Sequence, residues 1–415
     1  MDHSGKSEEI LEAVIRAIRA WHTQNITLDD CIAEIRSRHP ETARSAASIL
    51  FEYFRHKSFL DDLVMSSVSR GEIKPELKAA ALCALTQALF QDAIARESAV
   101  NVAVEHIKRT RNRAVSGFLN AVIRNALRKC RNNIPPPSFP EILRKRWERN
   151  FGADAEPAIR ACLKNPDTAI RIRKPELPPE LADSRAVQFP FAPDFHFRMA
   201  DDAGKILKSP AFLNGDLYIQ DPATALSVSL CREYIRGRVL DACAAPGGKT
   251  VMLHDLCEGK AEITAADRSQ NRLRQMCENF KRLHLETIHT VVMDAVKPSA
   301  EMGKFQLVFL DAPCSNTGVA RRRPDALWRF SESRLREAAA LQKKILRGIL
   351  PLVAEDGAVL YSTCSVEPEE DSLQIECFLK EHPEFELKKS SLLLPSEEHD
   401  GAFAALLVRN GMPQE

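Results

Sequence analysis

The first third of the chain is dominated by apolar residues that recur every three or four positions. Two sets of six such residues each fall on one helical face: Ile10, Leu11, Val14, Ile15, Ile18 and Trp21, then Val115, Phe118, Leu119, Val122, Ile123 and Leu127. This spacing is typical of amphipathic helices that bury one side. No alternating strand pattern interrupts it, so the sequence predicts an all-α domain over residues 1–133.

Proline marks the end of this helical region. Residues 134–140 read Ile-Pro-Pro-Pro-Ser-Phe-Pro, and consecutive prolines favour an extended linker. A helix is expected next, around Pro157–Lys164, followed by a strand around Thr168–Arg173. We therefore expect a small α+β domain over residues 141–215.

A third pattern begins near residue 216, where short aliphatic and aromatic runs precede helical segments. Each run is closed by a polar or turn-forming residue, as expected of buried strands in a parallel sheet. Four successive runs end in aspartate: Asp241, Asp267, Asp294 and Asp311. One such residue is commonly a helix cap, but four along one sheet edge are hard to explain by turn chemistry alone. The pattern predicts an α/β, Rossmann-like domain over residues 216–415, with a ligand at the carboxyl ends of its strands.

Composition narrows the class of protein. The 415 residues suit two or three domains, and the 58 basic and 57 acidic residues nearly balance. Eleven cysteines occur without a C-x-x-C pair, which argues against a zinc ribbon and against a secreted disulfide scaffold. No apolar stretch is long enough to span a bilayer, and the first 21 residues read as a charged amphipathic helix. We expect a cytoplasmic protein with no membrane partner and no metal.

A tight turn follows the first strand of the Rossmann-like region. It contains Cys243, Ala244, Ala245, Pro246, Gly247, Gly248 and Lys249. The two glycines are expected to remove side chains where the backbone approaches a ligand, and Asp267 at the end of the next strand suits the hydroxyls of a ribose. The segment contains neither G-x-G-x-x-G nor the leading glycine of a Walker A loop. The better candidate is S-adenosylmethionine, whose adenosine and cationic sulfonium tolerate nearby carboxylates.

Two cysteines follow separate apolar runs, Cys314 after residues 305–311 and Cys364 after residues 358–363. Either one alone is more often a small core residue than a reactive one. If the two strands are parallel neighbours, however, their ends lie roughly 5 Å apart and both thiols could face one pocket. Methylation of a pyrimidine at C5 needs such a sulfur, because a thiolate added at C6 makes C5 nucleophilic.

Three motifs together resemble the RNA cytosine-C5 methyltransferases. They are Cys243 to Lys249, Asp311-Ala-Pro-Cys314-Ser and Ser362-Thr-Cys364-Ser. Supporting segments are Ile219-Gln-Asp-Pro-Ala, Arg323-Pro-Asp-Ala-Leu-Trp328 and Asp400-Gly-Ala-Phe403. The resemblance covers almost the whole chain and points to the bacterial RsmB (Sun) subgroup, which acts on 16S ribosomal RNA. In that subgroup a helical RNA-binding domain of the NusB type precedes the catalytic part, and residues 116–125 resemble it.

The resemblance implies a role for each site residue. Cys364 would be the nucleophile, Cys314 would assist release of the methylated base, and Asp311 would protonate or hydrogen-bond ring N3. Residues 243–249 with Asp267, Asp294 and Asp311 would hold S-adenosylmethionine. The implied substrate is 16S ribosomal RNA before full subunit assembly, with the target base turned out of its stack.

Basic residues are concentrated at the end of the helical region. Residues 108–131 contain no acidic residue. Their basic residues are Lys108, Arg109, Arg111, Arg113, Arg124, Arg128, Lys129 and Arg131. Such a run is often a solvated helix face, but localised charge in a nearly neutral chain is also what a phosphate-binding surface requires. We expect this run to contact RNA backbone. The run Arg321-Arg322-Arg323, beside the Pro-Cys motif, is expected to contact phosphate as well.

Three other functions remain open at this point. A transfer RNA cytosine-C5 methyltransferase would use the same two cysteines, although the NusB-like region argues against it. A DNA cytosine methyltransferase would use the Pro-Cys thiol as nucleophile and would not need Cys364. A non-catalytic RNA-binding assembly factor could retain the cofactor fold, but the intact set of Asp and Cys positions disfavours it.

Overall fold

The structure is a computed structural model that describes residues 3–24, 26–69, 71–92, 94–130, 133–174, 176–200 and 203–410. Two compact units make up the chain. Unit 1 contains Met1–Gly152 and Arg323–Arg329, whereas unit 2 contains Ala153–Arg322 and Phe330–Glu415. The chain therefore leaves unit 2 once, for a short segment that belongs to unit 1.

Unit 1 is entirely helical in its described residues. Its helices are α1 His3–Gln24, α2 Leu28–Arg38, α3 Ala43–Arg55, α4 Lys57–Ser67, α5 Pro75–Phe90, α6 Arg96–Thr110, α7 Arg113–Cys130, α8 Glu141–Phe151 and α15 Asp325–Arg329. Helix α5 is buried on nearly all sides, from Leu77 to Ala88, as expected of a helix that is apolar all round. The apolar faces predicted for residues 10–21 and 115–127 pack into the same core, which confirms the all-α prediction.

The short segment Arg323–Arg329 joins the core of unit 1 through specific polar contacts. The buried Asp325 carboxylate accepts hydrogen bonds from the Leu28 backbone N–H at 3.0 Å and from Trp21 Nε1 at 3.4 Å. Trp328 Nε1 donates to the Phe54 carbonyl at 2.7 Å. The Arg-Pro-Asp-Ala-Leu-Trp motif after Cys314 thus stabilises the helical unit, a role that its position in the sequence did not indicate.

Unit 2 begins with a small antiparallel sheet. Its strands are β1 Thr168–Ile172, β2 Arg185–Val187, β3 His196–Ala200 and β4 Leu217–Ile219, in the order β2-β3-β1-β4. Helices α9 Ala155–Leu163, α10 Ala203–Ile206 and α11 Pro210–Leu213 accompany it. The helix and strand predicted near residues 157–173 are present. The boundaries proposed at 133, 141 and 215 stay predictions.

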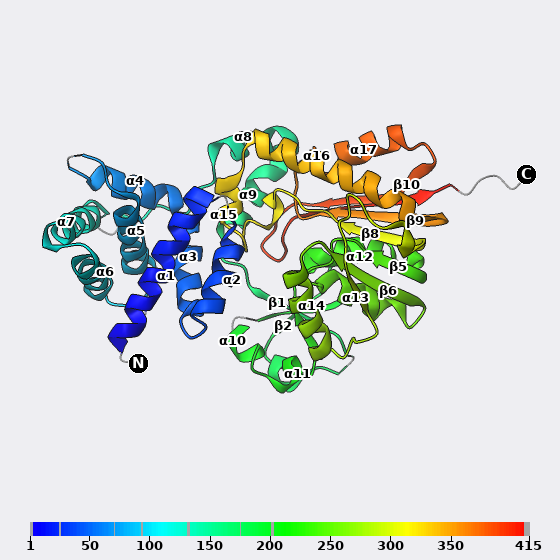
Figure 1. Cartoon of the computed structure of the whole chain (residues 1–415), viewed down its shortest axis with the longest axis horizontal. Helices are drawn as coiled ribbons and strands as arrows, with labels where there is room; N and C mark the ends of the chain where they lie inside the picture. Colours follow the sequence, from blue (N-terminus) through cyan, green and yellow to red (C-terminus); the bar gives the residue numbers. More distant parts are fainter. Residues whose placement is uncertain are drawn as a thin grey trace, which may run out of the picture. The chain divides into compact units, whose positions relative to one another are not determined.

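The larger sheet of unit 2 carries the candidate site (Figure 1). Its strands are β5 Gly237–Asp241, β6 Ala261–Asp267, β7 His289–Val292, β8 Phe305–Asp311, β9 Val353–Thr363, β10 Phe385–Leu393 and β11 Ala402–Arg409. They are ordered β10-β11-β9-β8-β5-β6-β7. Strands β9, β8, β5, β6 and β7 are parallel to one another, whereas β11 is antiparallel to both of its neighbours, β9 and β10. This is the predicted Rossmann-like sheet.

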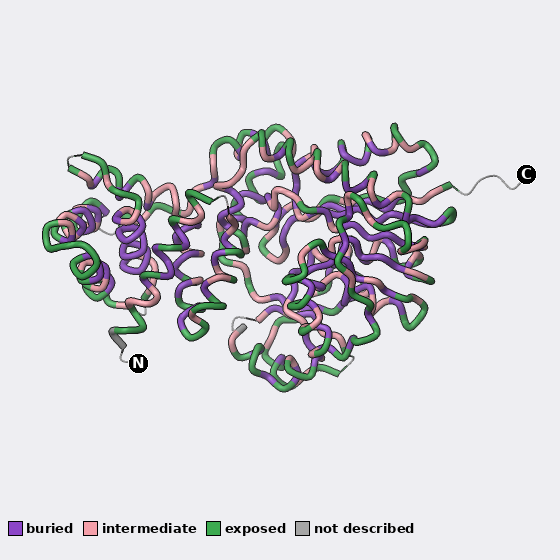
Figure 2. Tube along the Cα trace, viewed as in Figure 1, coloured by how far each residue is buried: buried purple, intermediate pink, exposed green. Residues whose placement is uncertain are grey.

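Helices cover both faces of this sheet, as Figure 1 shows. Helices α12 Ala225–Leu230, α13 Gly248–Cys257 and α14 Gln270–Arg282 pack on one face, where Leu307 and Phe309 of β8 point. Helices α16 Glu332–Ile349 and α17 Ser372–Glu381 pack on the other, against Val308 and Leu310. The central strands are consequently buried on both sides (Figure 2). Within the described residues, no helix has the length and apolar character needed to cross a membrane.

Candidate active site

The carboxyl ends of the parallel strands gather most of the predicted site residues. Asp241, Asp267 and Asp311 are the last residues of β5, β6 and β8, as predicted. Asp294 lies two positions beyond the end of β7, is exposed, and accepts a hydrogen bond from its near neighbour Val296. Because β5 lies between β6 and β8, the chain reverses its direction of winding at β5, which is where such sheets bind ligands.

Asp241 is the most buried acid of this edge, with 1% exposure. Thr250 donates to one of its carboxylate oxygens at 2.7 Å, while the other oxygen has no hydrogen-bond partner among the described residues. Burial raises the pKa of Asp241 to about 7, with a smaller contribution from Asp311. A buried carboxyl group with a free oxygen, next to further acids, fits a ligand that brings positive charge or donor groups. The predicted methyl donor meets that requirement.

The turn after β5 is fixed by its neighbours. The Ala244 N–H donates to the Ala266 carbonyl at 2.8 Å. Arg272 from α14 donates to the Ala245 carbonyl and lies 3.4 Å from the Asp267 carboxylate. Arg272 therefore joins the turn to the end of β6, a contribution that the sequence analysis missed because its partners are far apart in the chain. Cys243 lies in the same turn, and burial raises the pKa of its thiol to about 12.

Gly247 and Gly248 lie in close contact with protein side chains. Gly247 has a left-handed backbone (φ +97°), and a Cβ there would lie 2.7 Å from Met276 Cγ. A Cβ on Gly248 would lie 3.0 Å from Gln220 Nε2. Protein side chains already fill the space that these glycines leave. Close packing of α14 and the β4 loop against the turn therefore also favours glycine here, while the approach of a ligand to this backbone stays a prediction.

Lys249 is the last residue of the motif predicted to hold the methyl donor, and it lies at the start of α13. Its side chain forms an ion pair with Asp311 at the end of β8. The Ser362 hydroxyl donates to the same Asp311 oxygen at 2.9 Å, and Lys249 Nζ lies 3.2 Å from Ser362. The Asp311 side chain keeps 36% exposure. These contacts hold the Asp311 carboxylate in a fixed position while leaving part of it accessible.

The structure brings Cys314 and Cys364 together. Strands β8 and β9 are parallel neighbours with Asp311 opposite Ser362, and the two sulfur atoms lie 3.1 Å apart. Neither cysteine is part of a disulfide, and both are partly exposed. The contact with Cys364 and the surrounding burial hold the pKa of the Cys314 thiol well above its usual value. The predicted pairing of the two thiols is confirmed.

Buried polar groups form a support behind the two cysteines. Glu370 accepts hydrogen bonds from the Ser315 N–H and from Gln342 Nε2, each at 2.9 Å. Its burial raises the pKa of this carboxyl group, against the opposing effect of the serine hydrogen bonds. The sequence contained one signal for it, because the acid-rich stretch Glu367-Pro-Glu-Glu-Asp371 directly follows the Thr-Cys motif. We did not predict that Glu367, Glu370 and Asp371 would all be buried.

Two glycines allow the cysteine loops to approach each other. Gly318 N donates to the Cys364 carbonyl at 3.0 Å, and Gly401 N donates to the Gly318 carbonyl at 2.8 Å. A Cβ on Gly318 would lie 2.8 Å from the Cys364 carbonyl oxygen. Any larger residue would therefore push the Cys364 loop away from the Cys314 loop.

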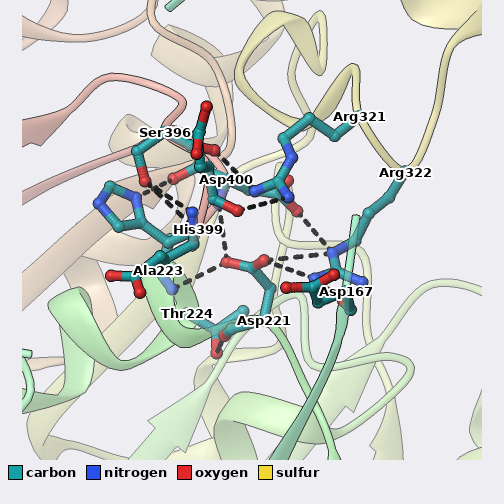
Figure 3. Close-up of polar contacts among 11 residues, drawn as sticks. Asp167, Asp221, Ala223, Thr224, Arg321, Arg322, Ser396, His399 and Asp400 are labelled. Atoms are coloured by element: carbon teal, nitrogen blue, oxygen red, sulfur yellow. Dashed lines mark hydrogen bonds and ion pairs between the residues drawn. The ribbon is translucent and has the colours of Figure 1, made fainter. Parts of the chain in front are cut away.

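The arginine run beside the Pro-Cys loop has a structural role (Figure 3). Arg321 is 1% exposed and donates to the Ser396 and Glu397 carbonyls at 2.7 and 2.8 Å. Arg322 forms ion pairs with Asp221 at 2.9 Å and Asp400 at 3.1 Å. The expectation that these two residues contact phosphate is wrong, because Arg321 is buried and Arg322 is paired with two carboxylates. Arg323 forms an ion pair with Asp29 within unit 1.

The basic run of unit 1 divides into two parts. Lys108, Arg109 and Arg111 form ion pairs with the acids Glu105, Glu8 and Glu76. On α7, by contrast, the exposed Arg124, Arg128 and Lys129 donate to the neutral groups Asn120 Oδ1, Asn125 Oδ1 and the Ser66 carbonyl. The available positive charge is therefore concentrated on α7. Arg131 lies outside the described residues.

Comparison with known proteins gives consistent matches. Residues 233–408 match the family described as 16S rRNA methyltransferase RsmB/F, and residues 9–128 match the NusB family. The ribosomal RNA small subunit methyltransferase B of Serratia proteamaculans is 31% identical over 71% of this chain and 73% of its own length. The probable enzyme of that name from Bacillus subtilis is 29% identical, over 91% and 88%.

Solved structures show the same fold. The protein PH0851 has a TM-score of 0.77 at 24% identity and covers 96% of this chain and 98% of its own. NSun6 from Pyrococcus horikoshii has a TM-score of 0.55 at 20% identity, over 66% of this chain and 98% of its own.

Proposed function

The chain belongs to the RsmB/F family of S-adenosylmethionine-dependent 16S rRNA methyltransferases, and from this premise we propose that it methylates C5 of a cytosine through a covalent adduct with Cys364. The observation that carries the proposal is the 3.1 Å separation of the Cys314 and Cys364 sulfur atoms at the carboxyl ends of two adjacent parallel strands. Methylation at C5 needs one sulfur to add to the ring, and the second sulfur offers a group to assist its release.

The proposed reaction uses the two thiols in sequence. The Cys364 thiolate adds to C6, and the electrons of the C5–C6 double bond make C5 nucleophilic. Bound S-adenosylmethionine supplies the methyl group that C5 takes. Water then takes the C5 proton, and the freed electron pair restores the C5–C6 double bond and expels the Cys364 sulfur as a thiolate, a step that Cys314 assists. The raised pKa of Cys314 supports this division, because a thiol that stays protonated is a poor nucleophile.

Asp311 is proposed to act on the ring nitrogen N3. Negative charge develops on the pyrimidine when sulfur adds at C6, and a proton or a hydrogen bond at N3 stabilises it. The carboxyl group is partly exposed and is held by Lys249 and Ser362, which supports a fixed orientation toward a base. Ser362 and Cys364 belong to the same motif, so the position of Asp311 is linked to that of the nucleophile.

The methyl donor is proposed to bind residues 243–249 with Asp267 on the ribose, Asp294 near the adenine and Asp311 near the turn. The buried acids Asp241 and Asp267 support a ligand that carries positive charge and hydroxyl donors. The contacts of Arg272 to Ala245 and Asp267 support a common binding surface formed by the turn and the end of β6.

Replacing Asp267 should weaken binding of the methyl donor. The change Asp267→Ala removes charge-assisted hydrogen bonds worth about 1.5–3 kcal/mol each, so calorimetry should show a loss of affinity of about tenfold or more. The affinity of Asp267→Asn for the methyl donor should lie between that of Asp267→Ala and that of the parent protein. The asparagine keeps an acceptor for the Ser269 N–H, which donates to Asp267 at 2.9 Å. Glu262→Gln, at an exposed position on the same strand, should have no effect. An unchanged affinity of Asp267→Ala for S-adenosylmethionine would exclude the ribose contact.

Unit 1 is proposed to bind RNA backbone through α7. Changing Arg124, Arg128 and Lys129 to glutamine should weaken RNA binding and reduce the slope of log affinity against log salt by up to about 2–3, because fewer counterions are released. Affinity for the methyl donor should not change. A control protein with Arg16, Arg36 and Arg38 changed to glutamine loses the same charge from exposed positions on α1 and α2. If the slope of log RNA affinity against log salt is unchanged in the α7 variant, α7 does not contact RNA and its basic side chains only face solvent.

Bisulfite sequencing with and without this gene tests the product. A 16S rRNA cytosine that is protected only when the gene is present would support the proposal. Protection confined to transfer RNA would support the transfer RNA alternative, and no protection in any RNA would support the non-catalytic one. Sequencing free 16S rRNA and assembled subunits separately would test the proposed action before full subunit assembly. A cytoplasmic location also remains a prediction.

A further inference from the structure

Asn316 connects the two cysteine loops. It lies two residues after Cys314 and has a left-handed backbone, with φ +61° and ψ +26°. Asparagine is one of the few residues other than glycine that adopt this conformation readily. Its side chain contacts both loops, because the Cys364 thiol donates to Oδ1 at 3.0 Å and Nδ2 donates to the Cys314 carbonyl at 3.1 Å.

The hydrogen bond from Asn316 Nδ2 to the Cys314 carbonyl determines which group is the donor in the contact with Cys364. A backbone carbonyl oxygen can only accept a hydrogen bond, so the amide nitrogen of Asn316 must face Cys314. The amide oxygen is then turned toward Cys364 and can only accept. Consequently, the hydrogen bond between Asn316 and Cys364 exists only while Cys364 carries its proton.

We propose that Asn316 is a positioning residue that keeps Cys364 protonated before the RNA base arrives and fixes the direction of its sulfur atom. The inference rests on the proposed function, since it treats Cys364 as the nucleophile. An acceptor aimed at a thiol favours the neutral form over the thiolate. Asn316 thus restrains the nucleophile in the free protein.

The Cys314 thiol, whose sulfur lies 3.1 Å from that of Cys364, can donate a hydrogen bond to a Cys364 thiolate and so acts in the opposite direction to Asn316. The buried acids near Cys364 act in the same direction as Asn316. Glu370 and Asp371, which precede α17, are buried acids, and Asp371 interacts electrostatically with Cys364. The cation Lys249 is paired with Asp311.

Two substitutions separate the acceptor from the backbone. Asn316→Gly removes the amide and tolerates the left-handed conformation. Asn316→Asp keeps the shape and the acceptor but adds a negative charge. In both variants and in the parent protein, alkylation of Cys364 by iodoacetamide would be followed across pH by peptide mass spectrometry, with a phosphine reductant present so that no disulfide forms.

We expect the alkylation profile of Cys364 to move in opposite directions. In Asn316→Gly its midpoint should shift to lower pH, and its rate near neutral pH should rise about two- to tenfold, the factor that one hydrogen bond provides. In Asn316→Asp the midpoint should shift to higher pH. Alkylation of Cys377, a partly exposed thiol on α17 with contacts to Lys343 and Glu381, should be the same in all three proteins.

Specific results would overturn the inference. A midpoint that does not move in the glycine variant, or that moves to higher pH, contradicts it. So does a uniform increase in alkylation of both Cys314 and Cys364 at every pH, because that pattern reports a loosened loop. The aspartate variant provides the same test if the glycine variant does not fold.

The alkylation experiment needs no methyl transfer. If the expected shifts appear in a protein that methylates no RNA, only the proposed function fails. If methylation proceeds and the profile stays unchanged, only the role of Asn316 fails.

Discussion

Cys364→Ser should abolish methyl transfer, lowering the rate by about a thousandfold or more, and should form no covalent complex with RNA. A serine hydroxyl is far less acidic than a thiol and a much poorer nucleophile. It is also close in size, so the fold around β9 should be kept. The measurement is transfer of labelled methyl groups to 16S rRNA under single-turnover conditions, together with denaturing electrophoresis of the protein–RNA mixture.

The matched control for this experiment is Cys377→Ser. Cys377 is also free and partly exposed, but it lies on α17 with contacts to Lys343 and Glu381. This variant should methylate RNA at the parental rate. Substantial methylation by Cys364→Ser, with Cys314→Ser inactive, would assign the nucleophile to Cys314 and favour the mechanism of the DNA cytosine methyltransferases.

Cys314→Ser should produce the second large effect, accumulation of protein covalently bound to RNA. Addition and methylation need only Cys364, so both should proceed once. Release should stall, because the group that assists expulsion of the Cys364 sulfur has lost its thiol. We expect a complex that survives denaturing electrophoresis and approaches one RNA per protein chain, with a first turnover close to that of the parent protein and almost no second one.

The double variant Cys314→Ser, Cys364→Ser distinguishes this adduct from other crosslinks. It should form no complex, because the proposed bond involves the Cys364 sulfur. A complex that persists in the double variant would point to a different attachment site. If neither single variant forms an adduct while both still bind RNA, the non-catalytic alternative gains support.

The two experiments and the Asn316 series concern different properties of one sulfur. The cysteine variants test which thiol reacts, whereas alkylation of the Asn316 variants tests how that thiol is held before it reacts. The 3.1 Å contact between the sulfurs also means that both sets of measurements need reducing conditions.

Local pattern was sufficient to predict the fold class. The apolar residues of α1 and α7 repeat with the helical period, and those of β5, β6 and β8 are concentrated in short segments that end in aspartate. Such periodicities follow from which side of an element is buried, so they can be read without knowledge of its partners. The positions of Asp241, Asp267 and Asp311 at strand ends followed from the same reasoning.

The sequence could also identify the two cysteines as a candidate pair, but not establish that they touch. Both follow predicted strands, and any two strand ends on the same edge are candidates for proximity. Their contact depends on β8 and β9 being neighbours in the sheet order, a choice made by the packing of all seven strands.

Only the tertiary structure shows which charged residues form contacts inside the protein. Arg321 and Arg322 looked like a phosphate-binding run, yet their partners Asp221, Ser396 and Asp400 come from distant segments. A buried charge is stable only when groups from other parts of the chain satisfy it, so neighbouring sequence cannot predict it. The same holds for Asn316, whose left-handed backbone and contact with Cys364 arise only where the two cysteine loops meet.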